Sequence, residues 1–349
     1  MPVPHIHAIG TAVPAHDIHA AFVGWARARL PEGERRVFDR MAQRSGIAHR
    51  WSVLPADCSP VAPGGFYATE PHPGTAARMA LYAREAPALA LAAIHDLSTR
   101  EPLGAITHLV VASCTGFVAP GIDQIIAREL GLPGSVERTL VGFMGCYAAI
   151  AALRTARHIV RSEPAARVLV ITVELSTLHL QPAQAIEPLL AMLQFGDGAA
   201  AAIVSAASHG VALGQPFAVT LPESAALIRW DITDAGFAMH LSGEVPHRIA
   251  AALADPPTVA AITGGRVVDG WAVHAGGRSI LDAVAQALHL EPHALDASRA
   301  VLDANGNMSS ATLMFVLARL MDAPPAHGVA LAFGPGLAAE GIAFGTAAT

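Results

Sequence analysis

Hydrophobic residues along the chain form short continuous runs that alternate with longer segments rich in helix-forming residues. An apolar run bounded by turn residues is typical of a strand buried on both faces of a sheet. Strands are predicted at residues 5–13, 107–113, 139–143, 167–173 and 199–204. Helices are predicted at residues 34–44, 76–97, 122–130 and 147–161. This alternation predicts an α/β fold with a mostly parallel sheet.

The second half of the chain repeats this arrangement. It holds a short strand at 271–274, helices at 279–288, 296–303 and 309–321, and two strands within 328–344 around a Gly-Pro-Gly turn. Two similar halves at this length predict a duplicated core. Because residues 205–225 are polar and contain glycine, we place the boundary there, which gives units 1–205 and 206–349.

Composition narrows the class of protein. Hydrophobic residues make up 53% of the 349 residues and charged residues only 14%, against about 25% in a typical soluble domain. The elements must therefore be covered on more than one side, in a layered core or an oligomer. The net charge of −6 disfavours nucleic acid or an anionic membrane as a partner. All 22 basic residues are arginine, which excludes lysine Schiff-base chemistry and a P-loop.

The sequence carries no targeting, membrane or metal-binding signal. No apolar run approaches the roughly 18 residues of a membrane span, and the first residues do not resemble a signal peptide. Cys58, Cys114 and Cys146 are too widely spaced for a disulfide framework or a zinc knuckle. No His-Glu-x-x-His or similar set indicates a metalloenzyme. We therefore expect a cytoplasmic, reduced protein without a metal, in which one thiol is present for its reactivity.

The sharpest local feature is the segment G-F-M-G-C-Y-A-A at 142–149, in which a strand runs into a helix. Gly145 allows a tight turn that places Cys146 at the first turn of that helix. There the helix dipole and free N–H groups favour the thiolate. The alternative is a core cysteine packed beside alanines, since free cysteine is often buried. Composition alone leaves the two readings equally open.

Two further segments place polar side chains at element ends. W-A-V-H-A-G-G at 271–277 puts His274 at the end of a strand, and N-G-N-M-S-S-A-T at 305–312 puts Asn307 just before a helix. A thiol, an imidazole and a carboxamide form a nucleophile, base and oxyanion-donor set if they meet. Taken singly, each is an ordinary surface or turn residue, and sequence spacing does not show that the three meet.

Taken together, the motifs resemble those of the type III polyketide synthases, the chalcone-synthase-like members of the thiolase superfamily, and the bacterial ones in particular. The resemblance covers nearly the whole chain in the family's order. It rests on G-T-A-V-P near residue 10, C-T-G-F-V-A-P-G-I-D at 114–123, G-F-M-G-C at 142–146, F-G-D-G-A-A-A at 195–201, V-H-A-G-G at 273–277, G-N-M-S-S-A-T at 306–312 and F-G-P-G-L at 333–337. It implies the layered αβαβα thiolase fold built from two duplicated halves, and a homodimer.

Carried over by position, the resemblance implies a catalytic triad. Cys146 is the nucleophile, His274 its imidazole partner and Asn307 the second oxyanion donor. The family's coenzyme A contacts fall on Arg40, Arg44, Gly276 and Gly277. A third basic position of the family is Val37 here, and the proline usual after the histidine is Ala275.

The resemblance also implies the substrate cavity. The residues that line or neighbour it are Phe195 and Met239 at the gatekeeper positions, with Cys114, Ser176, His179, Trp230 and Ser309. Ala119 matches a position that crosses the dimer interface into the partner's cavity. An inward-pointing indole at Trp230 would shorten the cavity and favour a small starter or few extensions, whereas the small Ala119 leaves room.

The implied reaction loads a starter acyl-CoA on the cysteine and extends it with malonyl-CoA, without a metal or organic cofactor. One alternative is an initiating ketoacyl-ACP synthase. That family carries His-Gln-Ala-Asn around its histidine, where this chain has His-Ala-Gly-Gly at 274–277. The other is a non-catalytic CoA-ester-binding protein, which the complete triad disfavours and the lost basic position at Val37 keeps open.

Overall fold

A computed structural model describes residues 1–54, 64–68 and 72–347 of the chain, so Cys58 lies outside the described residues. The helices are α1 His19–Arg29, α2 Glu32–Gln43, α3 Thr75–Ser98, α4 Ile122–Glu129, α5 Ala148–Ser162, α6 Ile186–Met192, α7 Val245–Leu253, α8 Pro256–Thr263, α9 Arg278–Ala287, α10 Asp296–Asn305 and α11 Ser310–Leu320. The strands are β1 His5–Ala12, β2 His16–Asp17, β3 Trp51–Ser52, β4 His108–Ser113, β5 Glu137–Gly142, β6 Arg167–Leu175, β7 Asp197–Ser205, β8 Val211–Thr220, β9 Ile228–Thr233, β10 Gly236–Leu241, β11 Gly270–Val273, β12 Gly328–Gly334 and β13 Ala338–Gly345.

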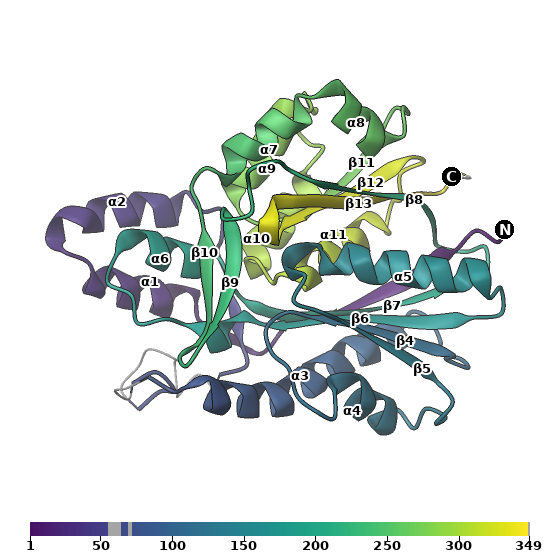
Figure 1. Cartoon of the computed structure of the whole chain (residues 1–349), viewed down its shortest axis with the longest axis horizontal. Helices are drawn as coiled ribbons and strands as arrows, with labels where there is room; N and C mark the ends of the chain where they lie inside the picture. Colours follow the sequence, from purple (N-terminus) through teal and green to yellow (C-terminus); the bar gives the residue numbers. More distant parts are fainter. Residues whose placement is uncertain (55–63, 69–71, 348–349) are drawn as a thin grey trace.

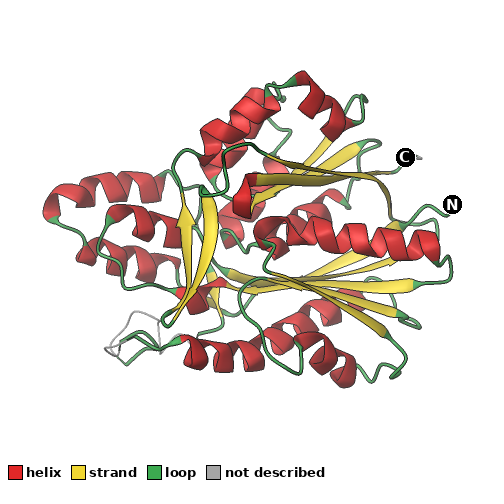
Figure 2. Cartoon of the chain, in the orientation of Figure 1, coloured by secondary structure: helices red, strands yellow, loops and turns green. Residues whose placement is uncertain are grey.

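The chain folds into alternating layers of helices and sheets (Figures 1 and 2). Helices α3 and α4 cover the outer face of the layer formed by β1, β7, β6, β4 and β5. Helices α7, α8 and α9 cover the layer formed by β11, β12, β13 and β8. Helices α5 and α11 lie between the two layers. This is the αβαβα arrangement that the resemblance implies.

Nine strands form one continuous ladder in the order β11-β12-β13-β8-β1-β7-β6-β4-β5. Strand β8 pairs with β1 only at Val211 and Ala212 and with β13 along its length, so the ladder passes from one layer to the other at β8. The predicted boundary at 205–225 therefore contains a strand that joins the two layers. A separate pair of strands, β9 and β10, forms an antiparallel hairpin.

The prediction of a mostly parallel sheet is wrong. Only β11–β12, β4–β5 and β4–β6 pair in parallel, whereas the other five neighbouring pairs of the ladder are antiparallel. Parallel pairing needs a crossover connection, and the stretch from β4 to β6 supplies it through α4 and α5. An apolar run has the same pattern whichever way its strand points, so the sequence did not distinguish the two.

Segment 15–75 contains two long helices, α1 and α2, where the sequence predicted only one. Helix α1 buries Phe22 and Ala26, which are one turn apart, and Gly24 lies between them. With only these two buried positions, its hydrophobic face is too narrow to stand out in a region rich in proline, glycine and arginine. The other predicted helices and strands are present, with bounds that shift by a few residues.

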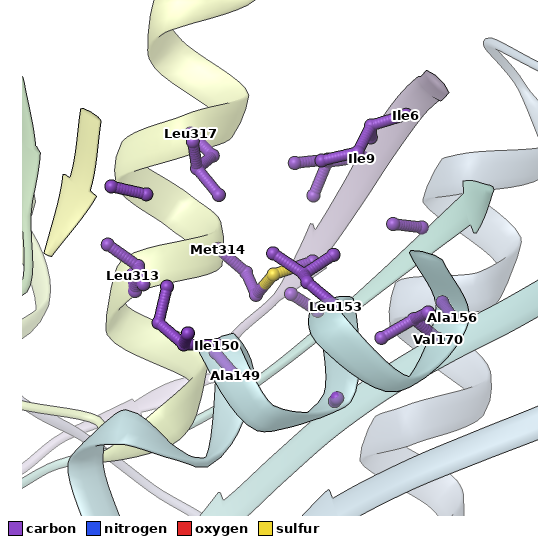
Figure 3. Packing of buried hydrophobic residues seen from close by; sticks show 14 of the residues in the cluster. Ile6, Ile9, Ala149, Ile150, Leu153, Ala156, Val170, Leu313, Met314 and Leu317 are labelled. Carbon is purple, nitrogen blue, oxygen red and sulfur yellow. The ribbon is translucent and has the colours of Figure 1, made fainter. Parts of the chain in front are cut away.

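The central helices explain the high alanine content. Helix α5 packs against both sheets and buries Ala148, Ala149, Ala151, Ala152 and Ala156. A helix covered on both sides needs small side chains for close approach, and larger ones fill the remaining gaps. Figure 3 shows Ile150 and Leu153 of α5 beside Leu313 and Met314 of α11, with Ile9 of β1 and Val170 of β6 in the same cluster.

Within the part of the chain that the structure describes, no helix has both the length and the apolar character needed to cross a bilayer.

Replacing Leu153 by alanine tests the packing of this central layer. Leu153 is fully buried, so we expect Leu153→Ala to lower the free energy of unfolding by about 2–5 kcal/mol through a cavity. Urea denaturation followed by circular dichroism measures this. Val267→Ala is the control, because Val267 is 87% exposed and its loss should cost no more than about 0.5 kcal/mol. Equal effects of the two substitutions would contradict the layered packing.

Candidate active site

Cys146 lies at a tight bend between β5 and α5. The strand ends at Gly142, Phe143 takes a positive φ of 56°, and a short 3₁₀ turn at Gly145–Tyr147 leads into the helix. Gly145 has φ 72°, and a β-carbon there would lie 2.3 Å from Cδ of Pro335. Only glycine fits this position without moving Pro335 and straining the backbone. The bend therefore fixes where the thiol of Cys146 points.

Cys114 holds the same bend from the neighbouring strand. Its sulfur accepts a hydrogen bond from the Gly145 N–H at 2.9 Å and donates one to the Gly145 carbonyl at 3.7 Å. Cys114 is 2% exposed and follows the end of β4 directly. It therefore neighbours the site and supports the bend beneath Cys146, but it does not line the cavity that opens beside Phe195.

His274 and Asn307 approach each other across Gly276. The Asn307 Nδ2 donates to the Gly276 carbonyl at 3.2 Å. A β-carbon on Gly276 would lie 3.5 Å from Nε2 of His274, which is van der Waals contact, so Gly276 lies directly beside the ring. The His274 backbone N–H donates to the Leu331 carbonyl at 2.8 Å, which anchors the end of β11 to β12. The two side chains thus share one small region.

The thiol belongs to this region as well. Hydrogen bonding by the Ser309 and Asn307 side chains lowers the pKa of Cys146, but burial raises it by more, so the net shift is upward. Burial alone lowers the pKa of His274. Neither ring nitrogen of His274 has a hydrogen-bond partner among the described residues. The structure therefore disfavours a lone thiolate, contrary to what the helix dipole alone predicted, because desolvation outweighs the dipole.

Ser309 and Asn307 are fixed by the loop before α11. Ser309 adopts a positive φ of 48°, and its N–H donates to Oδ1 of Asn307 at 2.8 Å. The Asn307 backbone bonds to both neighbours of Phe195: its N–H donates to Gln194 and its carbonyl accepts from Gly196. These backbone hydrogen bonds therefore hold Phe195 and Asn307 in a fixed relative position.

A buried carboxylate that sequence reasoning missed lies behind the thiols. Glu174 is fully buried in β6 and accepts hydrogen bonds from the Cys114 N–H, the Thr115 hydroxyl and the Ser310 hydroxyl. Burial raises its pKa to about 7 against the effect of these donors, and its charge raises the pKa of Cys146. The available signal was one acidic residue inside the apolar run of 167–175, where an unpaired charge is not tolerated.

A cavity opens beside Phe195. Of the residues expected to line it, five do so: Ser176, His179, Phe195, Trp230 and Met239. The indole of Trp230 points into it, with its ring centre 6.4 Å from that of Phe195 and 6.4 Å from that of His179. Trp230 and Met239 face each other across the β9–β10 hairpin. The hairpin therefore forms one wall of the cavity.

His179 has both ring nitrogens occupied. Its Nε2 lies 2.6 Å from the Thr115 carbonyl, and its Nδ1 accepts from the Phe237 N–H at 3.0 Å. Burial lowers its pKa to about 4, so the ring is neutral and donates through Nε2. Its ring stacks on Phe237 at 4.2 Å. These contacts make His179 a fixed part of the wall.

A second residue that the sequence did not single out is Arg50. It is 1% exposed, lines the cavity and donates from Nη1 to the carbonyls of Met192 and Phe195 at 3.0 and 2.8 Å. A buried arginine costs free energy unless its donors are used. Arg50 is therefore a positioning residue for the backbone of Phe195.

The remaining expected residues lie at the surface or at the mouth of the site. Arg40, Arg44 and Val37 are exposed along α2 and its C-terminal cap. A β-carbon on Gly46, just beyond α2, would lie 3.8 Å from the side chain of Arg278, so the end of α2 lies near the loop of Gly276 and Gly277. Ala119 is exposed and does not line the cavity of this chain.

A thiol at a tight strand-to-helix bend, beside an imidazole and a carboxamide in an αβαβα fold, defines a condensing enzyme of the thiolase class. Comparisons with known proteins specify the family. The family model for the N-terminal domain of chalcone and stilbene synthases matches residues 3–208, and that for the C-terminal domain matches residues 214–347. The chain therefore belongs to the chalcone and stilbene synthase family. It is a type III polyketide synthase, an acyltransferase that acts on coenzyme A thioesters.

Individual relatives agree with this assignment. The chain is 33% identical over 338 residues to the alpha-pyrone synthesis polyketide synthase-like Pks18 of Mycobacterium tuberculosis, covering 90% of this chain and 84% of that protein. The type III polyketide synthase domain of Steely1 from Dictyostelium shares the fold, with a TM-score of 0.90 and 24% identity over 99% of this chain and 100% of that one. PKS-I from the brown alga Ectocarpus siliculosus has a TM-score of 0.88 and 28% identity, over 99% of both chains.

Gly145→Ala tests the bend. We expect a loss of stability of at least about 1–2 kcal/mol from the positive φ alone, and a larger total because the new methyl group meets Pro335. Urea denaturation and product formation measure the two effects. Gly142→Ala is the matched control, since a β-carbon there meets nothing within 4 Å. If both variants behave like wild type, the bend does not need glycine.

Proposed function

We propose that the enzyme loads a starter acyl-CoA on Cys146, extends it by decarboxylative condensation with malonyl-CoA and cyclises the product to a pyrone or a phenolic ring of the resorcinol or phloroglucinol type. The observation that carries this proposal is that Asn307 links the other two residues: its side chain hydrogen-bonds the thiol of Cys146 and the carbonyl of Gly276, which lies beside the ring of His274. The cavity at Phe195 lies next to this group. The name of the relative from M. tuberculosis, which specifies alpha-pyrone synthesis, favours the pyrone.

In the loading step, the proton of the Cys146 thiol passes to His274. Burial disfavours each charge alone, so the thiolate and the imidazolium form together as a pair. The sulfur attacks the thioester carbonyl of the starter, and the carbon–sulfur bond to coenzyme A breaks. The departing coenzyme A thiolate takes the proton from His274, which returns the ring to its neutral form.

In the extension step, His274 and Asn307 donate hydrogen bonds to the thioester oxygen of malonyl-CoA. Loss of carbon dioxide leaves an electron pair that these donors stabilise as an enolate. The enolate carbon attacks the acyl group on Cys146, and the cysteine sulfur leaves as a thiolate that takes a proton from water. The extended chain is then on coenzyme A, and reloading on Cys146 allows another round. No metal or organic cofactor takes part in these steps.

Coenzyme A would enter past the surface arginines of α2. Arg40 and Arg44 lie one turn apart and are exposed, and the end of α2 lies beside the loop of Gly276 and Gly277. Guanidinium groups bind phosphates through charge-assisted hydrogen bonds, and glycines allow close backbone approach. Val37 supplies no such contact, so fewer phosphate bonds are formed.

We also propose a cytoplasmic homodimer in which each chain has two halves, 1–205 and 206–349. Strand β5 lies at an edge of the ladder with an exposed outer edge, and Phe117, Leu140 and Phe143 near it are about half exposed. An unpaired edge beside exposed aromatic rings favours burial against a second copy. Ala119 lies two residues from Phe117, where its small side chain would leave room for the partner's cavity.

Substitution of the triad tests the proposed function. With labelled malonyl-CoA and a panel of acyl-CoA starters, we expect Cys146→Ala to form no product and Asn307→Ala to lose about two to three orders of magnitude in rate. Mass spectrometry of the products measures this. Asn305→Ala is the matched control, because among the described residues the Asn305 amide bonds only Val301 and Trp51. This substitution should leave the rate within about threefold of wild type. If the wild-type protein forms no product with any starter, the proposed synthase function is wrong, and a non-catalytic CoA-ester-binding protein remains.

Trp230 tests the control of starter length. Its indole fills the cavity between Phe195 and His179, so we expect Trp230→Ala to raise the rate with long-chain starters relative to short ones by about tenfold or more. Competition between two starters, read by mass spectrometry, measures the ratio. Trp25→Ala removes a tryptophan that lies outside this cavity and should not change it. An unchanged ratio in Trp230→Ala would contradict the limiting role of the indole.

A further inference from the structure

Three side chains from distant parts of the sequence meet at one place that the polyketide chemistry does not use. His7 lies in β1, Glu101 follows the end of α3, and His209 lies in the loop between β7 and β8. Nδ1 of His7 lies 3.2 Å from Oε1 of Glu101, and Nε2 of His209 lies 3.3 Å from Oε2. We call these three residues the junction cluster, because the chain passes there from its first half to its second.

The spacing matches that of zinc ligands. In a tetrahedral zinc site with bonds of about 2.0–2.2 Å, neighbouring ligand atoms lie about 3.3–3.6 Å apart. The three potential ligand atoms of the junction cluster, one from each residue, all lie within 4.8 Å of one another. Each histidine already lies close to one oxygen of Glu101, His7 at 3.2 Å from Oε1 and His209 at 3.3 Å from Oε2. Small side-chain rotations would therefore complete the geometry, with water in the fourth position.

The cluster combines a buried ligand with an entry path. The side chain of His7 is fully buried and that of Glu101 is 16% exposed, whereas that of His209 is 53% exposed. An ion can reach the site from solvent on the side of His209 and is then held against the β1 strand. The rings of the two histidines lie 3.8 Å apart, so the exposed ring covers the buried one.

Surrounding groups orient these ligands. The Ser205 hydroxyl lies 3.0 Å from Nε2 of His7, and a hydroxyl can either donate to this nitrogen or accept from it. The His7 ring can therefore adopt the tautomer in which Nε2 carries the proton and donates to Ser205. The lone pair of Nδ1 is then free to bind a metal. Nη2 of Arg167 donates to Oε1 of Glu101 at 2.7 Å, and Arg167 also bonds the backbone carbonyls of Leu103 and Pro102. Such outer contacts fix the ligands of many metal sites.

The donor types suit a metal. Glu101 supplies a carboxylate oxygen, and His7 and His209 each supply a ring nitrogen. Zinc in proteins binds both kinds of donor.

We infer that the junction cluster is a structural Zn²⁺ site formed by His7, Glu101 and His209. The ion ties the loop between β7 and β8 to β1 and to the end of α3. This is where β1 leaves its pairing with β8 and its register with β7 shifts between Ile6 and Ile9. A bulge redirects a side chain, which here places the imidazole of His7 toward Glu101. Because the ion binds only the folded chain, it raises stability.

Titration with Zn²⁺ alone tests this inference. Untagged, metal-free protein is titrated by isothermal calorimetry, and the melting temperature is measured with and without Zn²⁺. We expect one Zn²⁺ per chain in wild type and a higher melting temperature with the ion. His209→Ala should weaken binding by at least about tenfold and remove the thermal shift. His209 is half exposed, so its loss should leave the fold intact.

His293→Ala is the matched control. His293 is exposed beside Asp296, and no third ligand joins this pair among the residues that the structure describes. We expect wild-type binding in this variant. Equal affinity in wild type and His209→Ala, or no binding by wild type, would overturn the inference. A cobalt(II) spectrum with a thiolate band would do so as well, because the junction cluster has no sulfur ligand.

Discussion

The site depends on one constraint, the burial of helix α5 between the two layers of strands. The helix must be lined with small residues to fit, and its N-terminal end can face only into the molecule. Cys146 precedes this end directly, after a bend that Gly145 alone permits and Cys114 secures from the next strand. The packing of the middle layer therefore fixes the position of Cys146.

The same burial shapes the chemistry. It raises the pKa of the Cys146 thiol and lowers that of the His274 imidazole, so each charge is unfavourable without the other. A proton that moves between the two groups creates both charges together and keeps the total unchanged. Asn307 is held by Gly276 and by the backbone around Phe195. In the proposed mechanism, its side chain donates a hydrogen bond to the substrate oxygen that becomes negative. In this proposed mechanism, the site therefore relies on coupled groups rather than on a permanently charged sulfur.

The sequence predicted the features of the fold and of the site that depend on local residue patterns. Buried strands, the turn glycine at Gly145 and the ends of elements that carry His274 and Asn307 are all visible in short segments. The direction of a strand relative to its neighbours is not visible in the sequence, because an apolar run has the same pattern both ways. The inward orientation of Trp230 depends on the β9–β10 hairpin, and the junction cluster joins residues about 200 positions apart. Contacts of this kind come from the tertiary structure alone. Glu174 was visible as a charge inside an apolar run, but its partners were not. Arg50 does not stand out in a segment rich in proline, glycine and arginine.

The most direct test of this account is the rate at which iodoacetamide alkylates Cys146 at pH 7 in wild type and in His274→Ala, followed by peptide mass spectrometry. Without the imidazole, the raised pKa of the buried thiol leaves little thiolate at this pH. We therefore predict a rate at least about tenfold lower in His274→Ala, which recovers as the pH rises. An unchanged rate at pH 7 would show that Cys146 is reactive without His274 and would contradict the coupled pair.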